Sequence, residues 1–72
     1  MRILITGATG FIGTSLIGRF LRERDVHDVL CCVRDIENAR LKLGIHRNIK
    51  YCSLSNSETI KDFNPEIVVH LA

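Results

Sequence analysis

Short apolar runs alternate with longer, more polar segments along this chain of 72 residues. Each apolar run has the length of one β-strand, and each longer segment has the length of a helix. The predicted strands cover residues 2–6, 29–33, 48–53 and 67–71. The predicted helices cover residues 11–24, residues 36–43, and a segment that runs from a cap at Asn56 or Ser57 to Asn64. This regular alternation of strands and helices predicts an α/β fold.

The first helix carries a periodic apolar stripe. Its apolar side chains recur at intervals of four, at Ile12, Leu16 and Phe20, and Leu21 lies beside them. This spacing predicts that the four side chains face the sheet. Gly18, inside the same helix, is expected to cost up to about 1 kcal/mol relative to Ala unless another group packs against it.

The predicted strands assemble into one parallel sheet. Residues 29–33 are apolar throughout, which is typical of a parallel strand covered on both faces. Right-handed crossovers predict the strand order 3-2-1-4, with the first two helices on one face and the third on the other. A ligand is expected over the carboxyl ends of the first and fourth strands, where the order reverses. The fourth strand would be an open apolar edge, through which we expect the isolated chain to self-associate.

Composition and charge argue against several classes of protein. Positive and negative side chains are interspersed and the net charge is +2, so no basic tract predicts nucleic-acid binding. No apolar run approaches the length of a membrane span. Three cysteines, two of them adjacent, do not make a disulfide framework, which favours a reducing, cytoplasmic location. We expect Cys31, Cys32 and Cys52 to pack in the core, and no Cys/His spacing predicts a metal site.

Three glycines, Gly7, Gly10 and Gly13, follow the first strand. A strand, a glycine turn and a helix start can bind the pyrophosphate of a dinucleotide, because the helix start presents unpaired N–H groups and a positive dipole end. Gly7 would permit the tight turn, Gly10 would let the backbone approach the phosphates, and Gly13 would let the helix pack close to the sheet. The pattern therefore predicts a dinucleotide site at this turn.

Two segments resemble one enzyme family. The segment T-G-A-T-G-F-I-G, residues 6–13, is similar to the cofactor fingerprint of the extended short-chain dehydrogenases/reductases, which include NAD(P)-dependent epimerases, dehydratases and reductases. The segment N-P-E-I-V-V-H-L-A, residues 64–72, is similar to the fourth strand of that family. The resemblance implies a partial Rossmann fold. Residues 1–72 would be the N-terminal part of an NAD(P)-binding domain, without its catalytic and substrate-binding part.

The resemblance also implies which residues bind the cofactor. Those at the pyrophosphate would be Gly7, Thr9, Gly10, Phe11, Ile12 and Gly13. The side chains of Phe11 and Ile12 could still pack in the core, because only their N–H groups would meet phosphate. Leu71 and Ala72 match a family segment that passes beneath the cofactor ribose. His70, just before them, is expected to be a hydrogen-bonded, half-buried histidine rather than a catalytic residue.

Arg34, after the second strand, bears on the choice between the two nicotinamide cofactors. An acid near this point would accept hydrogen bonds from the ribose 2′-hydroxyl of NAD, whereas a guanidinium would pair with the 2′-phosphate of NADP. Val33 occupies the usual place of the acid and Arg34 follows it, which favours NADP over NAD. NAD remains the alternative cofactor, because Asp35 is an acid close to this point. The alternative for Arg34 is that it is only a solvated surface charge.

Ser53 and Leu54, after the third strand, stand where the family usually has an acid and a hydrophobic residue. In the family that acid bonds to the adenine amine. Ser53 could accept the same hydrogen bond, but a neutral hydroxyl is a weaker acceptor than a carboxylate. The alternative is that Ser53 belongs only to the turn before the third helix.

Catalysis in this family needs a tyrosine with a lysine four residues later. Tyr51 is the single tyrosine; it lies in the third strand, and the residue four positions later is Ser55. We therefore assign no catalytic residue and expect no hydride transfer by these residues alone. The leading hypothesis is the cofactor-binding piece of an NAD(P)-dependent epimerase, dehydratase or reductase. The alternatives are a non-catalytic dinucleotide-binding or sensing module, a decayed remnant, and a structural fragment that binds nothing.

Overall fold

A computed structural model gives the structure of residues 1–23 and 27–71. Its strands are β1 (Arg2–Thr6), β2 (Asp28–Val33), β3 (Ile49–Ser53) and β4 (Ile67–His70). Its helices are α1 (Phe11–Arg22), α2 (Ile36–Leu43) and α3 (Ser57–Phe63). The predicted order of elements is confirmed, and the bounds differ from the prediction by only one or two residues. The end predicted for the first helix, residue 24, lies outside the described residues, and α1 already ends at its C-cap, Glu23.

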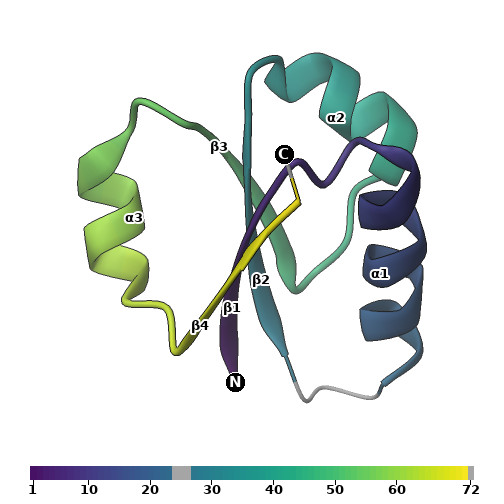
Figure 1. Ribbon diagram of the computed structural model, residues 1–72, viewed down its shortest axis with the longest axis horizontal. Coiled ribbons are helices and arrows are strands. Elements are labelled where there is room, and N and C mark those ends of the chain that lie inside the picture. The colour runs from purple at the N-terminus through teal and green to yellow at the C-terminus, as the bar shows by residue number, and fades with distance from the viewer. Residues whose placement is uncertain (24–26, 72) are drawn as a thin grey trace.

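The four strands form one parallel sheet in the order β3-β2-β1-β4, as the sequence predicts. In this register Leu4 of β1 is paired with Leu30 of β2 on one side and with Val68 of β4 on the other. The outer strands of the sheet are therefore β3 and β4. All four strands end at the same edge, where β1 leads into α1 (Figure 1).

Helices cover both faces of the sheet, with α1 and α2 on one face and α3 on the other (Figure 1). Because successive strand side chains point to opposite faces, β1, β2 and β3 each contribute to two cores. The larger core lies under α1 and α2 and includes Ile5, Ile17 and Cys31. The smaller core lies under α3 and consists of Leu4, Leu30, Cys32 and Cys52, with Ile60 and Phe63 packed against it.

The apolar stripe of α1 lies one residue further along than the sequence predicts. Leu16, Phe20 and Leu21 pack against the larger core as expected, but the side chain of Ile12 is 66% exposed. Ile17, at 1% exposure, occupies the centre of the buried face instead. The reason is that Gly13, four residues before Ile17, is the residue of the first turn that meets the neighbouring loop. The prediction that Ile12 faces the sheet is therefore wrong.

The second and third helices are capped by their own side chains. The carboxylate of Asp35 accepts a hydrogen bond from the Asn38 N–H at 3.1 Å, and Gly44 closes α2 with φ +83°. The side-chain oxygen of Asn56 accepts from the Thr59 N–H at 3.1 Å. These contacts satisfy N–H groups that a helix start leaves without partners. Of the two cap candidates for the third helix, Asn56 is thus the one used.

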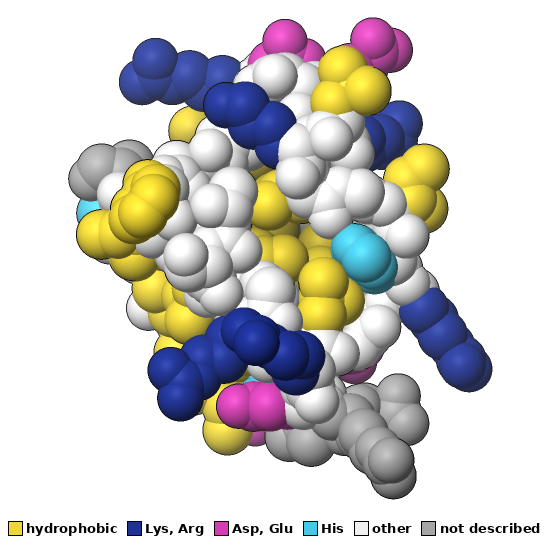
Figure 2. All heavy atoms as spheres, turned by 90° about the vertical axis from the view of Figure 1, so that its right-hand side faces the viewer, with side chains coloured by type: hydrophobic (Ala, Val, Ile, Leu, Met, Phe, Trp, Pro, Cys, Tyr) yellow, Lys and Arg dark blue, Asp and Glu magenta, His cyan; other side chains and the backbone are white. Residues whose placement is uncertain are grey.

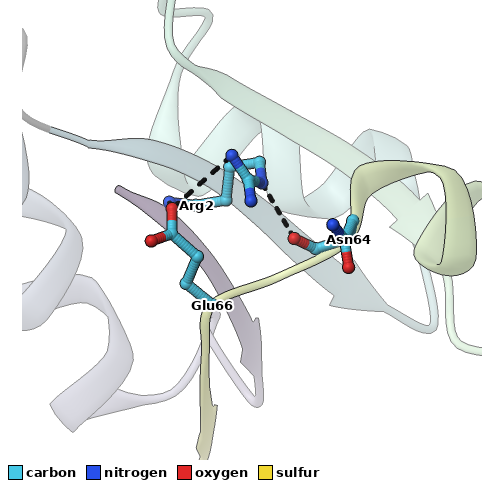
Figure 3. A network of polar contacts seen from close by, with 3 residues as sticks. All are labelled: Arg2, Asn64 and Glu66. Carbon is cyan, nitrogen blue, oxygen red and sulfur yellow. Dashed lines mark hydrogen bonds and ion pairs between the residues drawn. The ribbon is translucent and has the colours of Figure 1, made fainter.

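Polar contacts join the start of β4 to the start of β1 (Figure 3). The Arg2 Nε donates to the Asn64 carbonyl at 2.8 Å, and the Arg2 N–H donates to Glu66 Oε1 at 3.1 Å. The Arg2 guanidinium also lies 3.5 Å from the same carboxylate oxygen. These groups are about half exposed, so their main effect is to fix the position of β4 rather than to add much stability.

The two helical glycines of α1 should respond to alanine in opposite directions. A Cβ at Gly13 would lie 2.5 Å from the backbone of Ala8, so Gly13→Ala must displace α1 and should destabilise the chain by about 1–3 kcal/mol or more. A Cβ at Gly18 would meet nothing within 4 Å, so Gly18→Ala should stabilise it by about 0.5–1 kcal/mol through helix propensity. Urea unfolding of both variants measures this difference. Equal effects of the two substitutions would contradict the proposed packing of α1.

Candidate functional site

The loop between β1 and α1 is a tight glycine turn. Gly7 adopts φ +76°, a conformation that side chains disfavour, and its carbonyl accepts the Gly10 N–H at 3.2 Å. The Gly10 carbonyl then accepts the Thr14 N–H at 2.9 Å and starts α1. Gly13 packs directly on the backbone of Ala8, a residue of this loop, and not on a strand of the sheet. The predicted need for glycine at positions 7 and 13 is confirmed, with the loop as the partner of Gly13.

The start of α1 differs from the starts of the other two helices. Its cap, Gly10, offers no side-chain hydrogen bond, and its first turn contains no acidic residue. In contrast, α2 and α3 have side-chain caps and carry Glu37 and Glu58 in their first turns. Within the described part of the chain, the N–H groups of residues 11–13 have no hydrogen-bond partner. Unpaired N–H groups and the positive end of the helix dipole favour an anion here.

A cavity of about 360 Å³ opens beside this turn, at the carboxyl edge of the sheet. Four elements meet there: the loop after β1, the end of β2 with the start of α2, the loop after β3, and the end of β4. The residues that line it are Thr6, Gly7, Thr9, Cys32, Val33, Arg34, Asp35, Asn38, Leu54 and His70. The switch point between β1 and β4, predicted as the ligand position, lies on its wall.

Arg34 and Asp35 bring opposite charges to this cavity. Asp35 uses one carboxylate oxygen to cap α2. Arg34 is exposed, and among the residues that the structure describes its guanidinium has neither an ion pair nor a hydrogen bond. The cation is thus available to a ligand, whereas the acid is partly engaged in holding the helix.

His70 and Thr6 form the β4 side of the cavity. The Thr6 hydroxyl and His70 Nδ1 are hydrogen-bonded across the paired ends of β1 and β4. His70 is exposed rather than half-buried, because β4 is an outer strand of the sheet that the described residues form. The expectation of a hydrogen-bonded histidine is confirmed, and the expected half burial is wrong.

The sequence profile of the NAD dependent epimerase/dehydratase family matches residues 3–72, nearly the whole chain. The chain belongs to the NAD dependent epimerase/dehydratase family. This agrees with the family resemblance of the glycine segment and of the fourth strand.

Relatives of this family member include much longer proteins. Aldehyde reductase lnaA of Aspergillus flavus is 47% identical over 48 residues, which are 61% of this chain and 5% of that protein. Isonitrile lipopeptide synthase of Streptomyces coeruleorubidus is 33% identical over 60 residues, which are 83% of this chain and 4% of that protein. The chain therefore spans about one twentieth of the length of these curated relatives.

A solved structure confirms the fold of this family member. The dTDP-glucose 4,6-dehydratase of Bacillus anthracis str. Ames, solved in complex with NAD, superimposes with a TM-score of 0.78 at 20% identity. The match covers 100% of this chain and 26% of the dehydratase chain. At this identity the likeness shows a shared Rossmann-like α/β fold.

The structure brings together part of the predicted cofactor site. Gly7, Thr9, Arg34 and Leu54 all line the cavity. The loop that contains Gly7 and Thr9 leads directly into the start of α1, whose cap, Gly10, makes no side-chain hydrogen bond. The alternative of core packing for the first two helical side chains is wrong, since Phe11 and Ile12 are 90% and 66% exposed. Their predicted role, which uses only backbone N–H groups, stays a prediction.

Two other predicted residues, Ser53 and Leu71, do not line the cavity. The hydroxyl of Ser53 is 2.9 Å from that of Ser55 and accepts the Ser55 N–H at 3.3 Å, so it takes part in the turn before α3. Leu71 donates its N–H to the Thr6 carbonyl at 2.9 Å, and its side chain packs against the larger core. Ala72 lies outside the described residues. The roles of all three at the cofactor stay predictions.

Asn38 is a lining residue that sequence reasoning missed. It stands one turn into α2, and its N–H already serves the Asp35 cap. No motif marks it; the only available signal was its position three residues after a predicted helix cap. Thr6 was missed as well, although it is the first residue of the glycine segment and the last of β1.

The three cysteines are reduced and buried, which confirms their predicted place in the core. Cys31 faces the larger core, whereas Cys32 and Cys52 face the smaller one with their sulfur atoms 3.5 Å apart. Burial raises the pKa of Cys31 to about 12, with the nearby Cys52 as a smaller cause. Burial, followed by the hydrogen bond with Cys52, raises the pKa of Cys32 to about 12. Neutral thiols of this kind are poor nucleophiles.

In residues 1–23 and 27–71, no group of three His, Cys, Asp or Glu side chains is arranged to hold a metal ion. No helix among the described residues combines the length and the apolar character that crossing a bilayer requires.

The Tyr51 hydroxyl donates a hydrogen bond to the Gly44 carbonyl at 2.7 Å, and burial raises the pKa of Tyr51. This tyrosine therefore packs within the fold, away from the cavity.

The raised thiol pKa values predict alkaline destabilisation. In the unfolded chain a thiol loses its proton near pH 9, whereas folded Cys31 and Cys32 stay protonated until about pH 12. The free energy of unfolding should therefore fall above about pH 9, by up to about 1.4 kcal/mol per pH unit for each thiol. Urea unfolding at several alkaline pH values measures the slope. Cys31→Val removes one thiol and should make the slope shallower; an unchanged slope would contradict this origin.

Proposed function

We propose that this chain binds a nicotinamide dinucleotide, with NADP preferred over NAD, as the N-terminal part of a longer oxidoreductase, epimerase or dehydratase. The observation that carries the proposal is the start of α1. Its unpaired N–H groups directly follow the glycine turn, of which Gly7 and Thr9 line the cavity, whereas the other two helices are capped by their own side chains. A pyrophosphate supplies the negative charge and the acceptor oxygens that such a helix start lacks.

The cavity supports a cofactor that extends from β1 toward β2. From the glycine turn, one wall leads past Arg34 to the exposed side chain of Leu54. This order suits a pyrophosphate at α1, a ribose near the end of β2, and an adenine against Leu54. The dTDP-glucose 4,6-dehydratase with the same fold, which was solved in complex with NAD, supports the same cofactor class.

The preference for NADP rests on the difference between Arg34 and Asp35. A guanidinium can pair with a 2′-phosphate through two parallel hydrogen bonds, and that of Arg34 has no competing partner among the described residues. Asp35 could accept a hydrogen bond from a ribose hydroxyl with its second carboxylate oxygen, but its first oxygen already caps α2.

The buried, reduced cysteines further support a reducing, cytoplasmic location.

The chemistry of the longer enzyme would come from residues outside this chain. Within this chain, the Tyr51 hydroxyl donates a hydrogen bond to the backbone carbonyl of Gly44, and the residue four positions after Tyr51 is Ser55 and not a lysine. What this part contributes is the binding and orientation of the dinucleotide. We therefore propose that these residues bind the cofactor without catalysing hydride transfer.

Coenzyme titration tests the proposed function. The purified chain should be stabilised by NADPH, and a ligand at 100 times its dissociation constant adds about 2.7 kcal/mol to the free energy of unfolding. Thermal unfolding and the change in NADPH fluorescence on binding provide two independent readouts. The proposal fails if neither NADPH nor NADH raises the melting temperature of the chain and if the fluorescence of neither coenzyme changes when the chain is added.

Arg34→Ala tests the cofactor preference. Loss of a charged hydrogen bond to the 2′-phosphate should weaken NADPH binding by about tenfold or more and leave NADH binding nearly unchanged. Arg47→Ala is the matched control, because Arg47 is also exposed but lies before β3, at the opposite edge of the sheet. Equal losses for both coenzymes, or the same loss in the control, would contradict a role for Arg34 at the 2′-phosphate.

A further inference from the structure

Two of the buried thiols lie in contact with each other on neighbouring strands. Cys32 of β2 and Cys52 of β3 are paired in the register of the sheet, and their sulfur atoms are 3.5 Å apart. Both side chains point to the face that α3 covers, where they belong to the smaller core. The parallel pairing of β2 with β3 therefore sets the distance between the two thiols.

This pair has the geometry that a disulfide requires. Adjacent strands lie about 4.8 Å apart, which places the Cα atoms of paired residues within the range of roughly 4.4–6.8 Å that is found across disulfides. To form an S–S bond of about 2.05 Å, the two sulfur atoms would have to approach by about 1.5 Å. Changes in two side-chain torsions supply a movement of this size, so β2 and β3 can stay paired.

The two thiols differ in their access to solvent. Cys32 lines the cavity at the carboxyl edge of the sheet, whereas Cys52 does not. The exposed fractions of the two residues are only 1% and 4%, so a bulky reagent is excluded from both. Hydrogen peroxide is uncharged and little larger than water, and the cavity gives it a route to the sulfur atom of Cys32.

We propose that Cys32 and Cys52 are a site of reversible oxidation, at which hydrogen peroxide that enters through the cavity converts the two thiols to a disulfide. In the first step the Cys32 sulfur attacks a peroxide oxygen and the O–O bond breaks, which leaves a sulfenic acid and one water. In the second step the Cys52 sulfur attacks the Cys32 sulfur, the S–O bond breaks, and a second water leaves. The two thiols together lose two electrons and two protons, and one peroxide is reduced to two waters.

The surroundings of the pair make the first step slow and the second fast. Burial, followed by the hydrogen bond with Cys52, raises the pKa of Cys32 to about 12, and the thiolate is the form that attacks. Sustained exposure to peroxide is therefore needed. Once the sulfenic acid has formed, the second sulfur is already in contact with it. A reducing compartment would restore the thiols, so the reduced pair is the resting form.

Cys31 is a matched control within the same chain. It is 0% exposed, and its side chain faces the larger core, on the side of the molecule seen in Figure 2, where α1 and α2 cover the sheet. In the unfolded chain Cys31 and Cys32 are nearly equivalent partners for Cys52, at separations of 21 and 20 residues. A disulfide that forms in the folded chain should therefore join Cys52 to Cys32, whereas one that forms after unfolding should join it to either cysteine.

Peptide mapping of the 72-residue chain after incubation with hydrogen peroxide tests the proposal. The remaining thiols are blocked before digestion so that disulfides cannot exchange. In native buffer the Cys32–Cys52 disulfide should exceed the Cys31–Cys52 disulfide by about tenfold or more, and in urea the two should form in similar amounts. Dithiothreitol should return the free thiols. Equal yields in native buffer, or no disulfide after prolonged incubation, would overturn the proposal.

Two serine variants test the order of attack. Cys52→Ser removes the second thiol, so peroxide should carry Cys32 past the sulfenic acid to the sulfinic acid, which adds the mass of two oxygen atoms. Cys32→Ser leaves Cys52 without access from the cavity, so this thiol should be oxidised more slowly by about tenfold or more. The two variants carry the same substitution in the same core, which makes them matched controls for each other. Equal rates of oxidation would overturn the cavity as the route.

A bound dinucleotide should shield Cys32, an expectation that rests on the proposed function. NADP⁺, which does not reduce peroxide, should slow formation of the disulfide by about tenfold at a concentration that leaves about one tenth of the chains unliganded. If NADP⁺ displaces NADPH in the fluorescence assay but leaves the rate of oxidation unchanged, the cavity is not the route. If neither coenzyme binds, only the proposed function fails, because peptide mapping identifies the disulfide without any coenzyme.

Discussion

The close approach between α1 and Ala8 is the contact on which the candidate site depends. A Cβ at Gly13 would lie 2.5 Å from the Ala8 backbone, so only glycine lets the helix begin in this position. The approach fixes the first turn of α1 beside the left-handed turn at Gly7, at the carboxyl end of β1. The unpaired N–H groups of that turn therefore meet the same edge of the sheet at which β2 and β4 end.

The distribution of helix caps follows from this arrangement. Unpaired N–H groups at a helix start are ordinarily satisfied by side chains, as Asp35 and Asn56 do for α2 and α3. A side-chain cap on α1 would compete with any anion for the same donors. Gly10 avoids this competition, and its carbonyl still accepts the Thr14 N–H that begins the helix. In the proposed function, the N–H groups that the chain leaves unpaired at this helix start are the ones that bind the pyrophosphate.

Most of the fold could be predicted from the sequence because its signals are local. Apolar run lengths, glycine positions and cap residues gave the elements, and the chirality of crossovers gave the sheet order. The centre of the α1 stripe could not be predicted this way. A spacing of four is shared by the series through Ile12 and the series through Ile17, and the contact between Gly13 and Ala8 decides between them. That contact joins the helix to a loop, and no periodicity reports it.

The candidate site shows the same division between local and tertiary information. Arg34 and the glycine turn were predictable because each follows a strand directly. Asn38 was not, because it reaches the cavity only through the placement of α2 against the end of β2. Asp35 has a structural duty at the start of α2 that Arg34 does not share, so a change of charge at Arg34 leaves the helix cap intact. In the proposed function, cofactor preference can therefore vary at Arg34 without a change in the fold that positions it.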